Sequence, residues 1–88
     1  MPKIKFSTRF LNLYASLPLE IQKKVDKALR FLRENPRHPS LQAKPIQGKP
    51  GYYEARVDIH YRMAYVRLSN DTVEVTTVGI HDDVLKNP

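Results

Sequence analysis

Residue types that suit phosphate chemistry recur in the last third of the chain, on segments that alternate polar and apolar side chains. Arg56 and Arg62 lie on the first two of these segments, and His81 follows a third segment that ends at Gly79. A guanidinium matches the geometry of phosphate oxygens, and an imidazole exchanges protons near neutral pH. Together they predict a surface that binds a phosphate and moves a proton at it.

Each of these residues also has a purely structural interpretation. Arg62 can pair with a carboxylate on a neighbouring strand, and such ion pairs are common. Glu54 lies two residues before Arg56 on the same face of its strand, where it is either a general base or a neutralising partner. His81 can be an exposed histidine without a role. From residue types alone, the structural interpretation of Arg62 and Glu54 is favoured.

The charge of the chain is positive and unevenly distributed. The 88 residues carry a net charge of +6 at pH 7. Residues 1–56 hold twelve Lys/Arg against four Asp/Glu, whereas residues 57–88 hold three against five. A basic field attracts polyanions and speeds their encounter. Charge alone does not separate a nucleic acid, an acidic protein partner and a merely solvated surface.

Several function classes are excluded by composition. The chain has no cysteine, so it forms neither a disulfide nor a thiolate metal site. Its three histidines lack the spacing of a metal motif, so no metal and no cofactor are expected. The N-terminus has no long apolar run and no segment is apolar enough to span a bilayer. We therefore expect a cytoplasmic protein without a membrane contact.

The length predicts a single domain over residues 1–88. The expected elements are a strand at 3–6, helices at 8–16 and from Pro18 to Asn35, a loop at 36–51, strands at 52–58, 60–68 and 72–79, and a short tail from residue 81. The strand at 60–68 has apolar residues on both faces, so it is expected at the centre of the sheet.

The helices and strands combine into an α+β fold. The second helix is apolar on one face, at Ile21, Val25, Ala28, Leu29 and Leu32. The short break at Leu17-Pro18 joins the two helices as a hairpin. The order β-α-α-β-β-β predicts an antiparallel sheet with an N-terminal helical hairpin packed on one face.

Period-two alternation assigns the strand residues to the two faces of this sheet. Tyr53, Ala55 and Val57 are expected opposite Glu54 and Arg56. In the last strand, Val73 and Val75 are expected opposite Glu74, Thr76 and Val78.

Short motifs follow one another in a specific order over nearly the whole chain. They are the Leu17-Pro18 break, the helix end at 32–36, and the strand segments 53–57, 61–65 and 78–82. The ordered set resembles the RelE/ParE toxin superfamily of bacterial and archaeal type II toxin–antitoxin systems. The resemblance implies the β-α-α-β-β-β fold described above.

The resemblance to the RelE branch of this superfamily implies an endoribonuclease that cleaves mRNA in the ribosomal A site and inhibits translation. The ribose 2′-OH attacks the adjacent phosphate without a metal and leaves a 2′,3′-cyclic phosphate and a 5′-OH. The resemblance implies that Arg62 binds the scissile phosphate, Arg56 supports it and His81 transfers the proton. The further substrate-binding candidates are Tyr61, Lys49, His60 and Glu54.

Two departures from the RelE pattern keep other functions open. Glu54 stands where RelE has a lysine, and Leu85 is the nearest counterpart of an aromatic residue near the C-terminus. A ParE-like toxin shares the fold but inhibits DNA gyrase and has no RNase site. A degenerate member would only bind an antitoxin or nucleic acid.

The resemblance also implies partners. An acidic antitoxin is expected to wrap the toxin and cover its site. The RelE branch further implies the ribosome and its mRNA.

Overall fold

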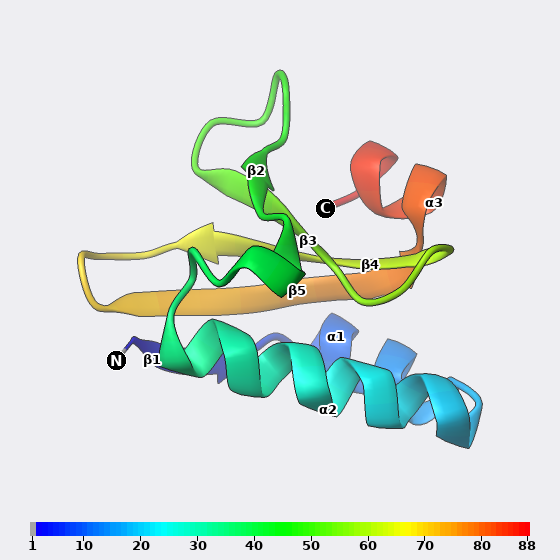
Figure 1. Cartoon of the computed structure of the whole chain (residues 1–88). Helices are drawn as coiled ribbons and strands as arrows, with labels where there is room; N and C mark the ends of the chain where they lie inside the picture. The colour runs from blue at the N-terminus through cyan, green and yellow to red at the C-terminus, as the bar shows by residue number, and fades with distance from the viewer. Residues whose placement is uncertain (1) are drawn as a thin grey trace.

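Two N-terminal helices lie on one face of a sheet, and a short C-terminal helix lies on the other (Figure 1). The computed structural model describes residues 2–88. Its elements are β1 (Lys3–Phe6), α1 (Thr8–Ala15), α2 (Leu19–Glu34), the 3-10 turn η1 (Pro39–Leu41), β2 (Lys44–Pro45), β3 (Tyr52–Arg56), β4 (Tyr61–Arg67), β5 (Thr72–Ile80) and α3 (His81–Lys86). The α+β fold with a helical hairpin on one face is therefore confirmed.

The sheet has five strands in the order β1-β5-β4-β3-β2. β4 lies at its centre, as its two apolar faces predict. β1 pairs parallel to β5, whereas the other pairs are antiparallel. The prediction of a wholly antiparallel sheet is wrong in this respect. β1 meets β5 after the whole helical hairpin and three further strands, so no tight turn dictates their relative direction.

The predicted loop and tail contain regular structure. The Pro-rich segment 36–51 includes η1 and β2, and β2 extends the sheet by pairing with β3. Residues 81–86 form α3 rather than a tail. All three elements are too short to produce a periodic pattern, so the sequence does not reveal them.

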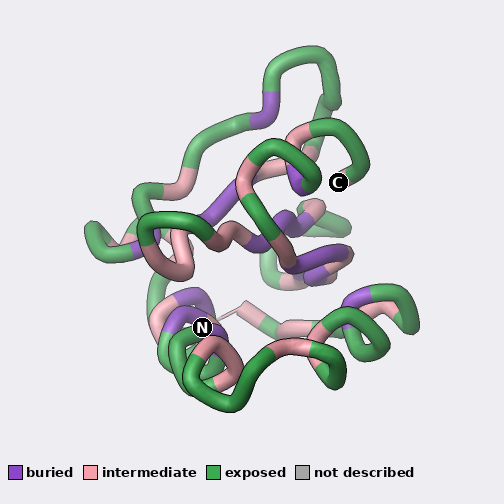
Figure 2. The backbone as a smooth tube through the Cα atoms, turned by 90° about the vertical axis from the view of Figure 1, so that its right-hand side faces the viewer, coloured by how far each residue is buried: buried purple, intermediate pink, exposed green. Residues whose placement is uncertain are grey.

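The main core lies between the helices and the sheet (Figure 2). Its largest fully buried side chains are Phe10, Leu32, Leu41, Met63, Val25 and Val75. A second, smaller cluster of Ile46, Ala64 and Val84 lies on the opposite face, beneath α3. The sheet is therefore covered on both sides, and its β4 and β5 strands are apolar on both faces.

A β-bulge changes the facing of residues along β5. Ala64 pairs with Thr77 and Tyr65 pairs with Val75, which leaves Thr76 as the extra residue. A bulge places two residues opposite one and shifts the alternation of side chains. Val78 consequently lies in the main core with Val75, and Thr77 is buried next to Ala64. The prediction that Val78 faces the same side as Thr76 is wrong for this reason.

The described part of the chain, residues 2–88, has no helix that is both long and apolar enough to cross a bilayer.

A pair of leucines on α2 tests the position of the core. Leu32 is fully buried, whereas Leu19 is 66 % exposed. We expect Leu32→Ala to lower the free energy of unfolding by about 2–5 kcal/mol, because the truncation leaves a cavity. Leu19→Ala is expected to change it by less than about 0.5 kcal/mol. Urea denaturation of both variants measures the difference, and similar losses would contradict this core.

Candidate functional site

A buried carboxylate lies among three basic side chains on the α3 face of the sheet. Glu54 on β3 is 4 % exposed. Its Oε1 atom lies 3.6 Å from Nε2 of His81, 3.9 Å from Nε of Arg62 and 3.9 Å from Nζ of Lys44. These distances exceed a normal hydrogen bond, so the four groups form an electrostatic cluster. We call Glu54, Arg62, His81 and Lys44 the Glu54 cluster.

Strand register brings the members of the cluster together. Lys44 on β2 pairs directly with Glu54 on β3, and Glu54 pairs with Ala64 on β4. Arg62 lies two residues before Ala64 and therefore on the same face. His81 begins α3 immediately after β5. Three consecutive strands and α3 thus each contribute one side chain.

The backbone around His81 is tied to the connection between β3 and β4. The His81 N–H donates to the carbonyl oxygen of His60 at 3.0 Å. The imidazole is 40 % exposed and lies between two carboxylates, with Nδ1 at 3.9 Å from Oδ1 of Asp82. Asp82 is itself largely exposed. The ring is therefore oriented by Glu54 on its buried side and open to solvent on the other.

The guanidinium of Arg62 is fixed along one edge. Its Nη1 donates to the carbonyl oxygens of Asp58 and Tyr61, and its Nε faces Glu54. Within residues 2–88 the second terminal nitrogen, Nη2, has no hydrogen-bond partner. The side chain is 17 % exposed. A guanidinium held this way presents one N–H edge to an incoming anion.

Asp58 organises the turn that holds Arg62. Its Oδ1 accepts from the backbone N–H groups of His60 and Tyr61, both at 2.8 Å, and its Oδ2 pairs with Nζ of Lys24 at 3.2 Å. Burial by itself raises the pKa of Asp58, but these hydrogen bonds and the Lys24 charge outweigh it and hold the pKa below its ordinary value. The carboxylate thus stabilises the turn in its ionised form.

Among residues 2–88, no ion pair joins the side chains of the remaining predicted site residues to the Glu54 cluster. Arg56 pairs in register with Arg62, but it lines a separate cavity of about 330 Å³ with Lys24 and Lys27 of α2. Lys49 is exposed in the loop after β2. His60 and Tyr61 contribute backbone carbonyls rather than side chains.

Lys44 is the member of the cluster that the sequence analysis missed. It lies in a segment expected to be a loop, and its strand is only two residues long. The sequence signal that could have indicated Lys44 is the basic character of that loop. A lysine directly opposite a glutamate on a neighbouring strand is a favourable pair. Only the pairing of β2 with β3 places it there.

The lowered pKa of Asp58 predicts a pH-dependent stability. A carboxylate with a folded pKa below its unfolded value of 3.8 stabilises the protein above that pH, and this contribution disappears as the pH falls through the folded value. We expect Asp58→Asn to be less stable than the wild type at neutral pH, and the difference to shrink on acidification. Urea denaturation at neutral pH and at about pH 3 measures this change.

Asp83→Asn is the matched control for the loss of one negative charge, since Asp83 is exposed on α3. Its difference from the wild type should not show the same decline in acid. An Asp58→Asn difference that stays constant over the pH range would contradict the role of the ionised carboxylate.

The comparisons with known proteins agree on one fold. A solved YoeB/ParE toxin from Agrobacterium tumefaciens is 19 % identical, with a TM-score of 0.75 over 90 % of this chain and 98 % of that one. A chain of the intact E. coli RelBE toxin-antitoxin complex is 23 % identical, with a TM-score of 0.73 over 91 % of this chain and 96 % of that one. YafQ from E. coli is 20 % identical, with a TM-score of 0.71 over 94 % and 97 %.

Sequence comparison adds the family. A search of curated proteins found no match. The family model described as the ParE toxin of the type II toxin-antitoxin system, parDE, matches residues 4–85. This match covers nearly the whole chain, and the structural neighbours include the E. coli RelE toxin, a YoeB/ParE toxin and YafQ. The chain therefore belongs to the ParE toxin family of type II toxin–antitoxin systems, within the RelE/ParE superfamily.

Proposed function

We propose that this toxin is a ribosome-dependent mRNA endoribonuclease and that the Glu54 cluster is its catalytic site. The observation that carries the proposal is a buried carboxylate within 4 Å of both an imidazole and a guanidinium. Cleavage of RNA by its own 2′-OH needs a base, an acid and a cation that stabilises the phosphorane. The cluster contains a group suited to each of these roles.

The reaction assigns one step to each group. Glu54 accepts the proton of the 2′-OH while the 2′ oxygen attacks the adjacent phosphorus. The bond from phosphorus to the 5′ oxygen breaks, and protonated His81 gives its proton to that oxygen. The products are a 2′,3′-cyclic phosphate and a 5′-OH. Arg62 faces the charge that develops on the phosphate oxygens.

The environment of Glu54 supports these roles. Its burial lowers the local dielectric and strengthens its interactions with the neighbouring charges. Lys44 is 66 % exposed beside it, so it supplies a cation close to the position where the RelE pattern has a lysine. Arg56 is assigned a supporting contact with the RNA backbone next to Arg62, in keeping with their shared register.

Cleavage of a ribosome-bound mRNA tests the proposal. We expect Glu54→Gln, Arg62→Ala and His81→Ala each to reduce A-site cleavage by about 10²–10⁴-fold, because each removes a proton-transfer group or the charge that stabilises the transition state. Arg30→Ala is the control, because Arg30 is exposed on α2 on the other side of the sheet. Toeprinting of the mRNA after incubation with purified toxin and ribosomes measures the rate.

Circular dichroism of each variant checks that it is folded. If folded His81→Ala and Arg62→Ala cleave as fast as the wild type, the site assignment is wrong.

A second candidate function is inhibition of DNA gyrase without RNA cleavage. The observation that favours it is the match to the ParE family model over residues 4–85. In the same preparation, wild-type toxin that blocks gyrase supercoiling and leaves ribosome-bound mRNA intact would replace the RNase proposal with this one.

The proposed partner is an acidic antitoxin. Related toxins have been solved as the RelBE toxin-antitoxin complex of E. coli and as RelE-RelB complexes from Pyrococcus horikoshii OT3 and Methanococcus jannaschii. The net charge of +6 suits an acidic partner. Large apolar side chains of β1, α1 and the start of α2 are exposed and suit an apolar contact, namely Phe6, Leu11, Leu13 and Leu19.

We expect the product of a small acidic open reading frame next to the toxin gene to co-purify with the toxin and to relieve growth arrest when both are expressed. Binding should weaken as salt rises, because opposite charges attract less when screened. Isothermal titration at low and high salt measures this. An adjacent acidic protein that neither binds nor relieves the arrest would contradict the proposal.

A further inference from the structure

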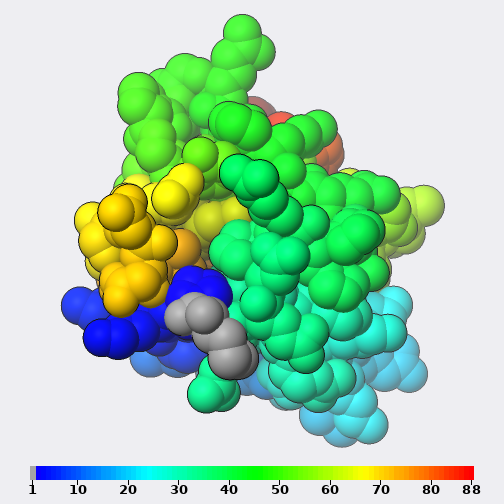
Figure 3. Space-filling model, turned by 60° about the vertical axis from the view of Figure 1, so that its left-hand side comes forward, coloured from blue at the N-terminus to red at the C-terminus, as the bar shows by residue number. Residues whose placement is uncertain are grey.

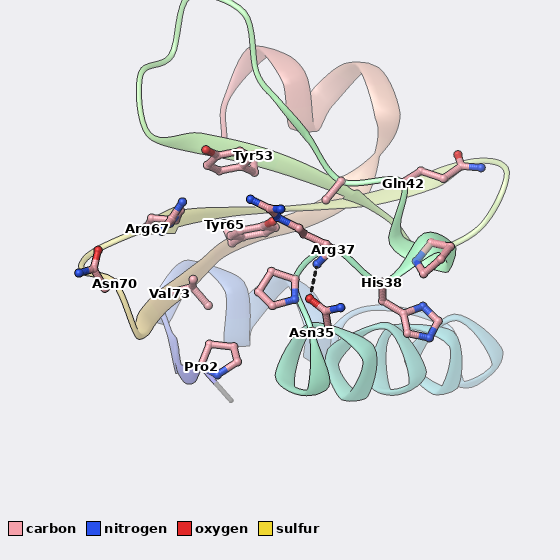
Figure 4. A pocket seen from close by; sticks show the side chains of 13 residues that line it. Pro2, Asn35, Arg37, His38, Gln42, Tyr53, Tyr65, Arg67, Asn70 and Val73 are labelled. Atoms are coloured by element: carbon pink, nitrogen blue, oxygen red, sulfur yellow. Dashed lines mark hydrogen bonds between the residues drawn. The ribbon is translucent and has the colours of Figure 1, made fainter.

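A cavity of about 480 Å³ lies on the helix side of the sheet, away from the Glu54 cluster. It opens between the segment that follows α2 and one end of the sheet, where β3 and β5 begin and β4 ends. The surface in Figure 3 is hollowed there. Figure 4 shows the side chains around it. Its volume is in the range of small-molecule sites. Neither the Glu54 cluster nor the proposed cleavage reaction uses this cavity.

Two stacked tyrosines form one wall of the cavity. Tyr53 and Tyr65 are cross-strand partners, with ring centroids 5.4 Å apart and planes 13° from parallel. Tyr65 is only 3 % exposed. No hydrogen bond to another group among residues 2–88 involves its hydroxyl, and this oxygen keeps some access to solvent. The hydroxyl therefore opens onto the cavity as an unused polar group.

The same hydroxyl stays protonated over the physiological range. Burial and the neighbouring Tyr53 raise the pKa of Tyr65 to about 12, against the opposing charge of Arg67. Tyr65 is thus available as a hydrogen-bond donor beside a cation.

Two arginines face the cavity from different segments. Arg67 follows Tyr65 by two residues and so lies on the same face of β4, and Arg37 comes from the segment after α2. The backbone N–H of Arg37 donates to Oδ1 of Asn35 at 3.0 Å, which fixes the backbone of this segment (Figure 4). Among residues 2–88, no Asp or Glu lines the cavity, and neither arginine forms an ion pair.

Two arginines without a carboxylate make a site for an anion. Guanidinium groups bind phosphate through paired hydrogen bonds. Aromatic rings beside them provide a surface on which a nucleobase stacks. The side-chain amide of Asn35 also lies at the cavity (Figure 4), and an amide NH2 group donates hydrogen bonds of the kind that polar base edges accept.

We propose that this cavity binds a nucleoside phosphate, with the base against the tyrosine pair and the phosphate between Arg37 and Arg67. The ligand is either a free nucleotide or one nucleotide of a single-stranded RNA, since both present the same chemistry. Because the cavity and the Glu54 cluster lie on opposite faces of the sheet, the proposal stands independently of the cleavage reaction.

Titration of the full chain with AMP tests the site, with adenosine and inorganic phosphate as partial ligands. We expect saturable binding of AMP, and binding of adenosine and of phosphate at least about tenfold weaker, because each lacks half of the contacts. The backbone amide NMR signals of Tyr65, Arg67 and Asn35 and the ring signals of Tyr65 should shift. Absence of saturable AMP and RNA binding, or shifts confined to other residues, would overturn the proposal.

Variants separate this site from general attraction to a basic protein. Arg67→Gln and Arg37→Gln are expected to weaken AMP binding by about tenfold each, and Tyr65→Phe should weaken it while keeping the ring. Lys23→Gln is the matched control for charge, because Lys23 is exposed on α2 outside the cavity. An equal effect of Lys23→Gln and of both arginine variants would overturn the assignment.

A short oligoribonucleotide distinguishes the two sources of the ligand. Binding at least about tenfold tighter than AMP, with the same dependence on Arg67, assigns the site to RNA, because further phosphates add contacts. Equal affinity assigns it to a free nucleotide. Glu54→Gln should bind AMP like the wild type, so failure of the cleavage proposal leaves this result unchanged.

Discussion

The buried carboxylate of Glu54 sets the arrangement of the α3 face of the sheet. Taking a charge out of water costs several kcal/mol, even after the protein relaxes around it, unless opposite charges and hydrogen-bond donors replace the solvent. Here three basic side chains converge on one carboxylate oxygen. Each comes from a different element. The pairing of β2 with β3, the face of β4 on which Arg62 lies and the position of α3 therefore all bring a basic side chain to Glu54.

The same cluster explains why two interpretations of Glu54 do not exclude each other. In the free protein the carboxylate neutralises Arg62 and orients His81, which is a structural role. In the proposed cleavage reaction, a phosphate occupies the Arg62 edge and the same carboxylate takes part in proton transfer beside the imidazole.

The two faces of the sheet are specialised differently. The helix face carries the main core and ends in the tyrosine-lined cavity, and the α3 face carries the small apolar cluster and the Glu54 cluster. The bulge at Thr76 makes this division possible, because it lets Val78 stay in the core while Gly79 lies opposite Arg62. The Asp58 carboxylate accepts hydrogen bonds that fix the turn before β4, and the Asp58 backbone carbonyl accepts from the guanidinium of Arg62. This turn therefore holds the guanidinium in place.

The sequence by itself determined the long elements, their order and the residue types of the site. Helical and strand periodicity is local, so α1, α2 and the three later strands were predictable, and so were Arg62, His81 and Glu54 as candidates. Tertiary structure alone decided the parallel direction of β1, the shift in phase along β5 and the presence of Lys44 beside Glu54. Each of these depends on which strands pair and in which register, and pairing is set by burial and backbone hydrogen bonding in the folded domain rather than by the pattern within one segment.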